Sequence, residues 1–218
     1  MKELFSRHKK TLIIASLICL IPMVFGLIMW NKLPDPMPTH FGADNQPNGY
    51  SSKAFAVFGL PLFMIAMEWL CLFMSSVDPR RKNLAPKVIT LVLYIIPVIS
   101  LIASGGMYAM ALGYNFNMSF FMSMLLGVMF IVIGNYLPKC RQTYTLGIKL
   151  PWTLANEENW NKTHRMAGPL WMIGGAAQMA LAFLPGETSF IAMMILLALV
   201  VGIPTVYSFL LARKQGQI

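Results

Sequence analysis

The chain has 218 residues, of which 57% are hydrophobic and 11% are charged, and its net charge is +9. A soluble domain carries about 25% charged residues, so this composition excludes an ordinary soluble domain. The basic residues stand between long apolar runs and form no separate basic domain, which argues against direct binding of nucleic acid.

Six apolar runs are long enough to cross a hydrocarbon core about 30 Å thick. Helices are expected because a helix satisfies its own backbone hydrogen bonds, and the alternating pattern of barrel strands is absent from the sequence. The sequence therefore predicts an all-α integral membrane protein, a bundle of six transmembrane helices. The predicted spans are residues 11–30, 54–76, 88–112, 118–137, 166–184 and 189–212.

The distribution of charge predicts the orientation of the bundle. All but two of the 17 lysines and arginines fall in segments that this arrangement places inside, and only Lys32 and Lys53 fall outside. Cytoplasmic loops carry such an excess of positive charge, so both termini are expected in the cytoplasm, with the basic residues near anionic lipid. The first run is too long for a signal peptide and lacks a cleavage site of small residues, so a retained helix is predicted.

The outside connection, residues 31–53, is expected to form a short ordered flap over the outer mouth of the bundle. Three prolines at alternate positions predict an extended start, residues 39–41 can form a short strand, and Asn48-Gly49 is a turn signal. The candidates for contact with an extracellular ligand are His40, Phe41, Asp44, Asn48 and Tyr50.

A metal at this flap has weak support. No Cys, second His or carboxylate stands at ligand spacing from His40, which favours a hydrogen-bonded structural histidine over a metal ligand. Asp44, Asn45 and Asn48 could hold Ca²⁺, but they lack the full loop pattern of such sites.

Glu68 is the one ionisable residue well inside a predicted span. At about 1.5 Å per residue it lies roughly 20 Å from the outer end of the second helix. A carboxylate there is costly and should face a partner or water. One interpretation is a proton or cation site, and the other is a structural hydrogen bond or a side chain that reaches toward the inner surface.

The cytoplasmic connection, residues 134–168, is rich in aromatic and hydrogen-bonding residues. Gly147 suits a turn, and Pro151 restricts the preceding residue to an extended shape. Asn156 is a good N-cap, and the two acids after it lie where the helix dipole favours them. On the helix that follows, one face carries Trp160, His164, Gly168 and Trp171, and the opposite face carries Asn161, Lys162 and Arg165.

This pattern predicts an interfacial helix that leads into the fifth span. Its simplest role is a membrane-surface anchor with Trp at the level of the headgroups. We expect more, because lipid anchoring does not require the turn-containing stretch before it. Asn135 would hydrogen-bond the backbone of that stretch, and Trp152 and Trp160 would wedge it against the inner ends of helices 4 and 5. Lys149 and Arg141 would form a basic edge for lipid phosphates or an acidic partner.

No catalytic constellation is recognisable. The sequence lacks a Ser/His/Asp set in a motif context, a zinc-protease helix and a phosphate loop, and its three cysteines show neither a disulfide framework nor metal spacing. We therefore predict no enzyme, no metal and no cofactor. A membrane enzyme remains a third interpretation, supported only by the two polar loops.

Three motifs follow one another in the cytoplasmic stretch: a Gly-Asn pair at the end of a helix, a Gly-Ile-basic-x-Pro-Trp-Thr-Leu run, and a Trp followed by a Thr-His pair and a Gly. Together they resemble the signature of the SdpI-type immunity protein family. One departure is Lys149-Leu150, where the family usually has Arg-Thr, since Lys keeps the charge but loses the bidentate fork. The candidate residues are Asn135, Arg141, Gly147, Ile148, Lys149, Pro151, Trp152, Thr153, Trp160, His164 and Gly168.

The outer segment resembles the small domain of unknown function, DUF1648-like, that often precedes this signature. Its Leu-Pro start, its His-Phe pair and its closing Lys53 are present. Asn45 stands where the family often has Gly, and Asn tolerates positive φ nearly as well. We expect an N-terminal unit, residues 1–76, with the flap, and an SdpI-like four-helix unit, residues 77–218, with the signature loop 134–168.

The resemblance implies a multi-pass protein of a bacterial plasma membrane. The best-known family member protects its cell against a secreted peptide toxin of the cannibalism type and also captures a small cytoplasmic autorepressor. The expected partners are therefore membrane lipids, a secreted peptide toxin and a cytoplasmic transcriptional repressor. The alternative is a small transporter or exporter that uses Glu68.

Overall fold

A computed structural model describes residues 2–217 of the chain. Within this range five helices are long and apolar enough to cross a membrane, and each overlaps a predicted span, as expected of a helical membrane protein. These are α1 (Lys2–Ile28), α2 (Leu60–Val77), α3 (Pro86–Ala111), α4 (Met118–Tyr136) and α7 (Gly186–Lys214). The other elements are strands β1 (Met37–Phe41) and β2 (Pro47–Ser51), helices α5 (Pro151–Ala155) and α6 (Glu157–Leu181), and single turns at Phe55–Gly59, Arg81–Asn83 and Leu137–Lys139.

The chain divides into two compact units. The first comprises Met1–Phe73 and Ile89–Met122, and the second comprises Met74–Val88 and Ser123–Ile218. The boundary predicted after residue 76 lies close to the first of these breaks. Most of α3, however, packs with the first unit.

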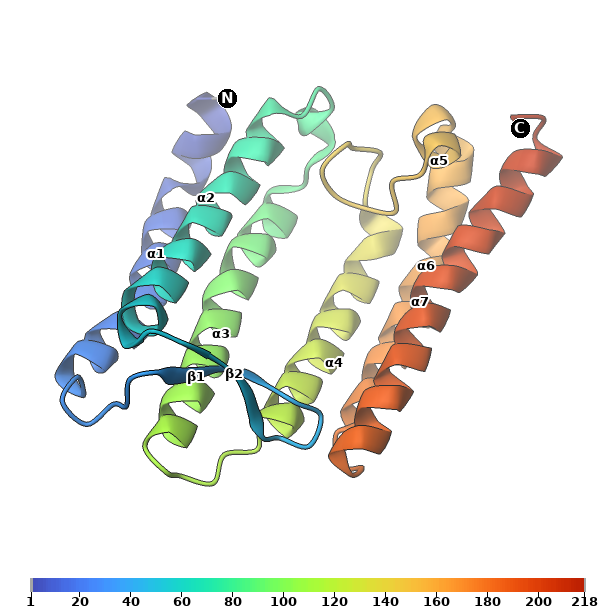
Figure 1. Ribbon diagram of the computed structural model, residues 1–218. Coiled ribbons are helices and arrows are strands. Elements are labelled where there is room, and N and C mark those ends of the chain that lie inside the picture. Colours follow the sequence, from blue (N-terminus) through green and yellow to red (C-terminus); the bar gives the residue numbers. More distant parts are fainter. Residues whose placement is uncertain (1, 218) are drawn as a thin grey trace. The chain divides into compact units, whose positions relative to one another are not determined.

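In the first unit, α1 packs closely against α3 and against the turn that leads into α2. The rings of Phe25 and Tyr108 lie with their centres 5.5 Å apart. Gly26 permits this approach, because a Cβ atom there would lie 2.7 Å from the Tyr108 hydroxyl and 2.8 Å from the side chain of Val57. The hairpin of β1 and β2 lies at the end of the unit where α1 ends (Figure 1).

The flap forms an antiparallel hairpin, but its turn is not where the sequence placed it. Residues 42–46 make the turn, with Asn45 at a φ of 63°, as its predicted tolerance of positive φ allows. The prediction of a turn at Asn48-Gly49 is wrong, since both residues lie in β2. Gly49 is needed there because it pairs with His40, and a Cβ atom on it would lie 2.8 Å from that of His40.

Two residues fasten the hairpin to the helices of the same unit. The side chain of Asn45 donates to the carbonyl of Phe116 at 3.0 Å and accepts from the backbone N–H of Ser119 at 3.3 Å. At the base of the hairpin, the ammonium of Lys53 donates to the carbonyls of Trp30 and Leu33, which follow α1. These bonds hold the hairpin against neighbouring segments of the same unit.

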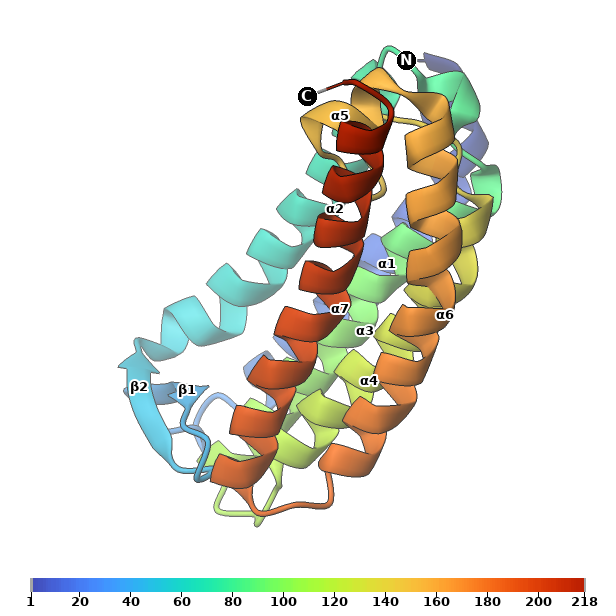
Figure 2. The same ribbon diagram turned by 90° about the vertical axis from the view of Figure 1, so that its right-hand side faces the viewer.

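In the second unit, α4, α6 and α7 lie side by side (Figures 1 and 2). The contact of α4 with α6 depends on glycine. A Cβ atom on Gly134 would lie 2.7 Å from the Gly168 carbonyl, and about two helical turns along, one on Gly175 would lie 2.5 Å from the Gly127 carbonyl. Small residues allow such close backbone approach between membrane helices.

Helix α6 contains most of the predicted fifth span, residues 166–184, yet it is not among the five apolar helices. Its C-terminal half is rich in glycine and alanine and contains Gln178, whose side chain is fully buried and donates to Ser123 on α4. The helix runs unbroken from Glu157, so the segment predicted as an interfacial helix continues directly into the predicted fifth span. The cap at Asn156 was placed correctly: its side chain accepts from the N–H groups of Glu158 and Asn159.

Candidate functional site

The signature segment, residues 134–168, surrounds one buried aromatic pair on α6. The rings of Trp160 and His164 are stacked with their centres 4.0 Å apart, and neither side chain is more than 1% exposed. Gly147 lies against both rings at a φ of +114°, and a Cβ atom there would lie 2.6 Å from His164 Nε2 and from the Trp160 ring. The turn predicted at Gly147 is therefore the point where the irregular stretch docks on α6.

Hydrogen bonds define the tautomer of His164. The backbone N–H of Ile148 donates to Nε2 at 2.8 Å, so this nitrogen carries no proton, and Nδ1 donates to the Trp160 carbonyl at 2.8 Å. Burial lowers the pKa of His164, and the bond to the Trp160 carbonyl opposes this only in part. The neutral imidazole is thus one of the links between the stretch and α6.

The folded protein should lose stability as the pH falls through about 6.5, the ordinary pKa of histidine. Below that value the unfolded chain binds a proton at His164 and the native chain does not, so the free energy of unfolding falls until the pH reaches the lowered native pKa. Melting temperatures measured at several pH values from about 7.5 down to about 5 should show this decrease in stability as a step. In His164→Asn the step should shrink, and an equal step in both proteins would contradict the assignment.

The stretch between Cys140 and α5 is held by a chain of amide and hydroxyl groups. The side-chain amide of Gln142 donates to the carbonyls of Thr153 and Leu154 at 2.7 and 3.0 Å. The backbone carbonyl of Gln142 accepts from the side-chain amide of Asn83. Asn135 was predicted to bond this backbone, and that prediction is wrong. Its side chain is exposed and accepts from Lys139, because α4 turns Asn135 away from the stretch.

Trp152 and Trp160 both hold the segment within the unit, but the hydrogen bond of Trp152 goes to α7, the predicted sixth span, and not to the fourth or fifth helix. The indole N–H of Trp152 donates to Ser208 on α7 at 2.9 Å, and that of Trp160 donates to the Cys140 carbonyl at 2.8 Å. Asn159 donates to the Ser208 carbonyl at 3.0 Å. The anchor interpretation fails for Trp160, which is fully buried and cannot reach headgroups.

The strongest connection was not foreseen. Asp78, in the connection between α2 and α3, is 2% exposed and accepts four hydrogen bonds. Its Oδ2 atom accepts from the N–H groups of Tyr144 and Thr145 and from the Thr145 hydroxyl, and its Oδ1 atom accepts from the N–H of Arg80. A lone acid in an otherwise basic loop was the available signal.

The predicted basic edge is exposed. Arg141 and Lys149 both lie at the surface, and the Lys149 ammonium donates to the Thr145 carbonyl at 3.1 Å. The Thr153 hydroxyl closes a turn of the motif: it accepts from the N–H of Leu150 at 2.9 Å and donates to the Ile148 carbonyl at 2.8 Å.

On the hairpin, the structure brings two of the five outer candidates together. His40 Nδ1 and Asn48 Oδ1 are hydrogen-bonded across the strands, as the structural interpretation of His40 requires. The Asp44 carboxylate accepts from the N–H of Gln46 within the turn. Tyr50 is 59% exposed, and Phe41 is half-buried. Among residues 2–217 no group of three His, Cys, Asp or Glu side chains could hold a metal ion.

Glu68 is fully buried in the first unit. One carboxylate oxygen accepts from the Ser16 hydroxyl on α1 at 3.2 Å, and Ser16 in turn accepts from the indole N–H of Trp69. The other oxygen has no hydrogen-bond partner among the described residues. The suggestion that Glu68 reaches the inner surface is therefore wrong.

Comparisons with known proteins match both motifs. Residues 139–208 match the SdpI/YfhL protein family, and residues 17–65 match a domain of unknown function, DUF1648. The chain is 27% identical over 211 residues to "Immunity protein SdpI" of Bacillus subtilis (strain 168). The aligned region covers 94% of this chain and 97% of that protein. No solved structure matches the chain significantly. The chain is thus a multi-pass bacterial membrane protein whose signature segment matches the SdpI/YfhL protein family.

Proposed function

We propose that this protein is a membrane immunity protein that protects its cell against a secreted peptide toxin, without catalytic activity. The observation that carries the proposal is the similarity to Immunity protein SdpI, which extends over 94% of the chain and so includes both the hairpin and the signature segment. The proposed partners are membrane lipids, the toxin on the outer side, and a small cytoplasmic repressor if the protein also signals.

The proposal includes six spans with both termini in the cytoplasm. Helix α6 is proposed as the sixth span because it lies along α4, a candidate span, from Gly168 to Gln178. That is a length of about 15 Å, half of a hydrocarbon core. An even number of spans returns the chain to its starting side, and the excess of lysine and arginine in the loops assigns that side to the cytoplasm.

Accessibility tags should report this topology. Tags at either end or at Lys82 should react only from the cytoplasmic side, and a tag at Asn48 should react only from outside. Membrane-impermeant labelling of intact and opened cells makes the measurement. A cytoplasmic Asn48 tag would show that the six-span arrangement is wrong.

The hairpin is proposed as the toxin-facing surface. It presents His40, Asn48 and Tyr50 as exposed side chains on strands that Asn45 and Lys53 hold against the helices. A fixed and exposed surface suits recognition, since little ordering is needed on binding.

Replacing His40 with alanine should weaken protection against the toxin while the protein reaches the membrane in normal amounts. The change removes an exposed ring and its bond to Asn48, and leaves the two fastenings of the hairpin intact. Survival of toxin-treated cells at matched membrane abundance is the readout, with Asn31→Ala as an exposed control in the same segment. Equal survival of all three proteins would exclude His40 from recognition.

The signature segment is proposed as the cytoplasmic contact surface. The buried network of Asp78, Gln142 and Trp160 fixes the backbone, so the basic edge of Arg141 and Lys149 is presented in one geometry. Such an edge suits lipid phosphates or an acidic patch on a repressor.

The second candidate function is transport. It is favoured by Glu68, a fully buried carboxylate within a span with one oxygen unpartnered among the described residues. Intramembrane acids often mark ion or proton pathways. Glu68→Gln keeps the shape and the bond from Ser16 but cannot exchange a proton, so a transporter should lose function and an immunity protein that only binds its toxin should not.

A further inference from the structure

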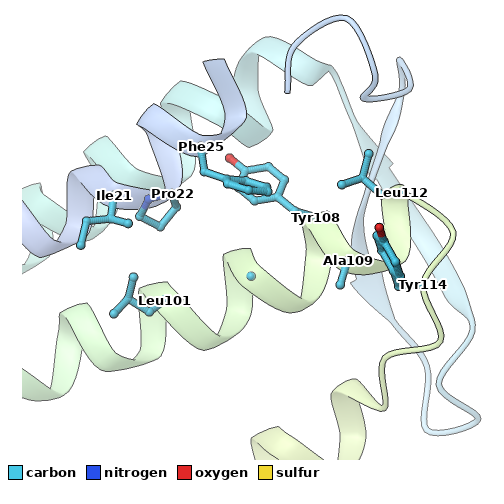
Figure 3. A pocket seen from close by; sticks show the side chains of 9 residues that line it. Ile21, Pro22, Phe25, Leu101, Tyr108, Ala109, Leu112 and Tyr114 are labelled. Atoms are coloured by element: carbon cyan, nitrogen blue, oxygen red, sulfur yellow. The ribbon is translucent and has the colours of Figure 1, made fainter. Parts of the chain in front are cut away.

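The first unit contains a cavity of about 310 Å³ that the proposed function does not use (Figure 3). It lies between α1 and α3 and is lined on α1 by Ile21, Pro22 and Phe25. Its volume falls at the lower end of the range for pockets that hold small molecules, about 300–1,000 Å³.

The lining restricts the chemistry of an occupant. The polar side-chain groups among the nine lining residues are the hydroxyls of Tyr108 and Tyr114. The Tyr108 hydroxyl lies against Gly26, where a Cβ atom would be 2.7 Å away, and Figure 3 shows it pointing toward α1. A peptide backbone in the cavity would leave most of its amide groups without partners, which is costly, so the lining favours a hydrocarbon.

The position of the cavity indicates where that hydrocarbon comes from. Four lining residues are exposed apolar or aromatic side chains of the first unit: Ile21 at 53%, Phe25 at 42%, Leu101 at 36% and Tyr114 at 69%. Ile21 and Leu101 belong to candidate spans, so their exposed sides face lipid and the cavity opens to the bilayer.

Its length matches one leaflet. The lining residues run from Leu101 on α3 to Leu112 just after its end, which is about 16 Å at 1.5 Å per residue. This is roughly half of a hydrocarbon core about 30 Å thick. Tyr114 follows the end of α3, and tyrosine is enriched at the interface between membrane and water.

We propose that this cavity binds one acyl chain of a membrane phospholipid, with the headgroup beside Tyr114 in the leaflet nearest the hairpin. Gly105 makes the room for it. A Cβ atom on Gly105 would meet nothing within 4 Å, whereas one on the adjacent Gly106 would lie 2.5 Å from the ring of Phe116. Close packing within the unit therefore accounts for glycine at position 106, whereas the space that an occupant needs accounts for glycine at position 105.

The test uses the full-length protein in phosphatidylglycerol vesicles that contain a small fraction of phosphatidylglycerol with a diazirine on its acyl chain. After irradiation, labelled residues are mapped by mass spectrometry. The label should concentrate on residues 21–25 and 101–114. Gly105→Leu fills the cavity and should reduce that label at least about five-fold, because an overfilled site excludes its ligand.

The matched control is Gly202→Leu on α7, another glycine within a span whose Cβ atom would meet nothing within 4 Å. Its labelling of residues 21–25 and 101–114 should equal that of the wild type. Gly105→Ala, a smaller change, should give an intermediate loss if Gly105→Leu disturbs folding.

Three results would overturn the proposal. The first is a label spread evenly over all lipid-facing residues, which would indicate ordinary surrounding lipid. The second is a Gly105→Leu protein that folds and is labelled like the wild type. The third is weak labelling by the lipid together with strong labelling by a diazirine-bearing apolar peptide, which would assign the cavity to a peptide.

Discussion

Replacing Gly147 with alanine is expected to undo the fold of the signature segment. A non-glycine residue at positive φ costs about 1–2 kcal/mol. The added methyl group would also lie 2.6 Å from the His164 and Trp160 rings, which are buried and stacked and cannot move aside. Overpacking of this kind costs about 1–3 kcal/mol, so the combined loss of about 2–5 kcal/mol is a large part of the stability of a typical domain.

A control variant separates the cost of the positive φ from the cost of the steric clash with the two rings. Gly113 also has a positive φ, +84°, but a Cβ atom there would meet nothing within 4 Å. Gly113→Ala should therefore show only the backbone cost of about 1–2 kcal/mol. Thermal unfolding in detergent, followed by the loss of monodisperse protein, compares the two, and equal melting temperatures would refute the docking of Gly147 on α6.

Replacing Asp78 with alanine should be as damaging. It removes the acceptor of three donors in the signature segment and of the Arg80 N–H, and that acceptor is a carboxylate only 2% exposed. Hydrogen bonds to a charged group are worth about 1.5–3 kcal/mol each, and donors left buried without partners add their desolvation cost. A loss of about 3–5 kcal/mol is expected, because several donors lose their acceptor at once.

Two further variants grade the effect of Asp78. Asp78→Asn keeps an oxygen for Tyr144 and Thr145 and loses mainly the Arg80 bond and the charge, so it should cost about 1–3 kcal/mol. Asp44→Ala removes an exposed aspartate with a similar bond to a backbone N–H and should cost less than about 1 kcal/mol. If Asp78→Ala melts at the temperature of Asp44→Ala, the carboxylate does not hold the segment.

The sequence predicted the parts of this structure that follow from local chemistry. Apolar runs predict helices, Asn156 predicts a helix start, Gly147 predicts a turn, and Asn45 suits positive φ, because each depends on the residue and its near neighbours. The two-sided pattern of α6 also held: Trp160 and His164 are buried, and Lys162 and Arg165 are exposed.

The incorrect predictions concern residues whose interaction partners are not their near neighbours in the sequence. Asn48-Gly49 has the composition of a hairpin turn, but pairing with His40 draws both residues into a strand. Asn135 was predicted to bond the backbone because it lies at the end of α4. Gln142 has that role instead, because it lies beyond the end of α4, within the irregular stretch itself. Asp78 could not be matched to Tyr144 and Thr145, since no local pattern joins residues so far apart in the sequence.

The most direct test of the account is protection itself. The chain is expressed in a Bacillus subtilis strain that lacks SdpI, at a membrane abundance matched to SdpI, and the cells are challenged with the peptide toxin that SdpI resists. The account predicts that cells with this chain, and cells with its Glu68→Gln variant, survive far better than cells with an empty vector. Survival no better than that of the empty vector, with the wild-type chain folded in the membrane at the matched level, would contradict it.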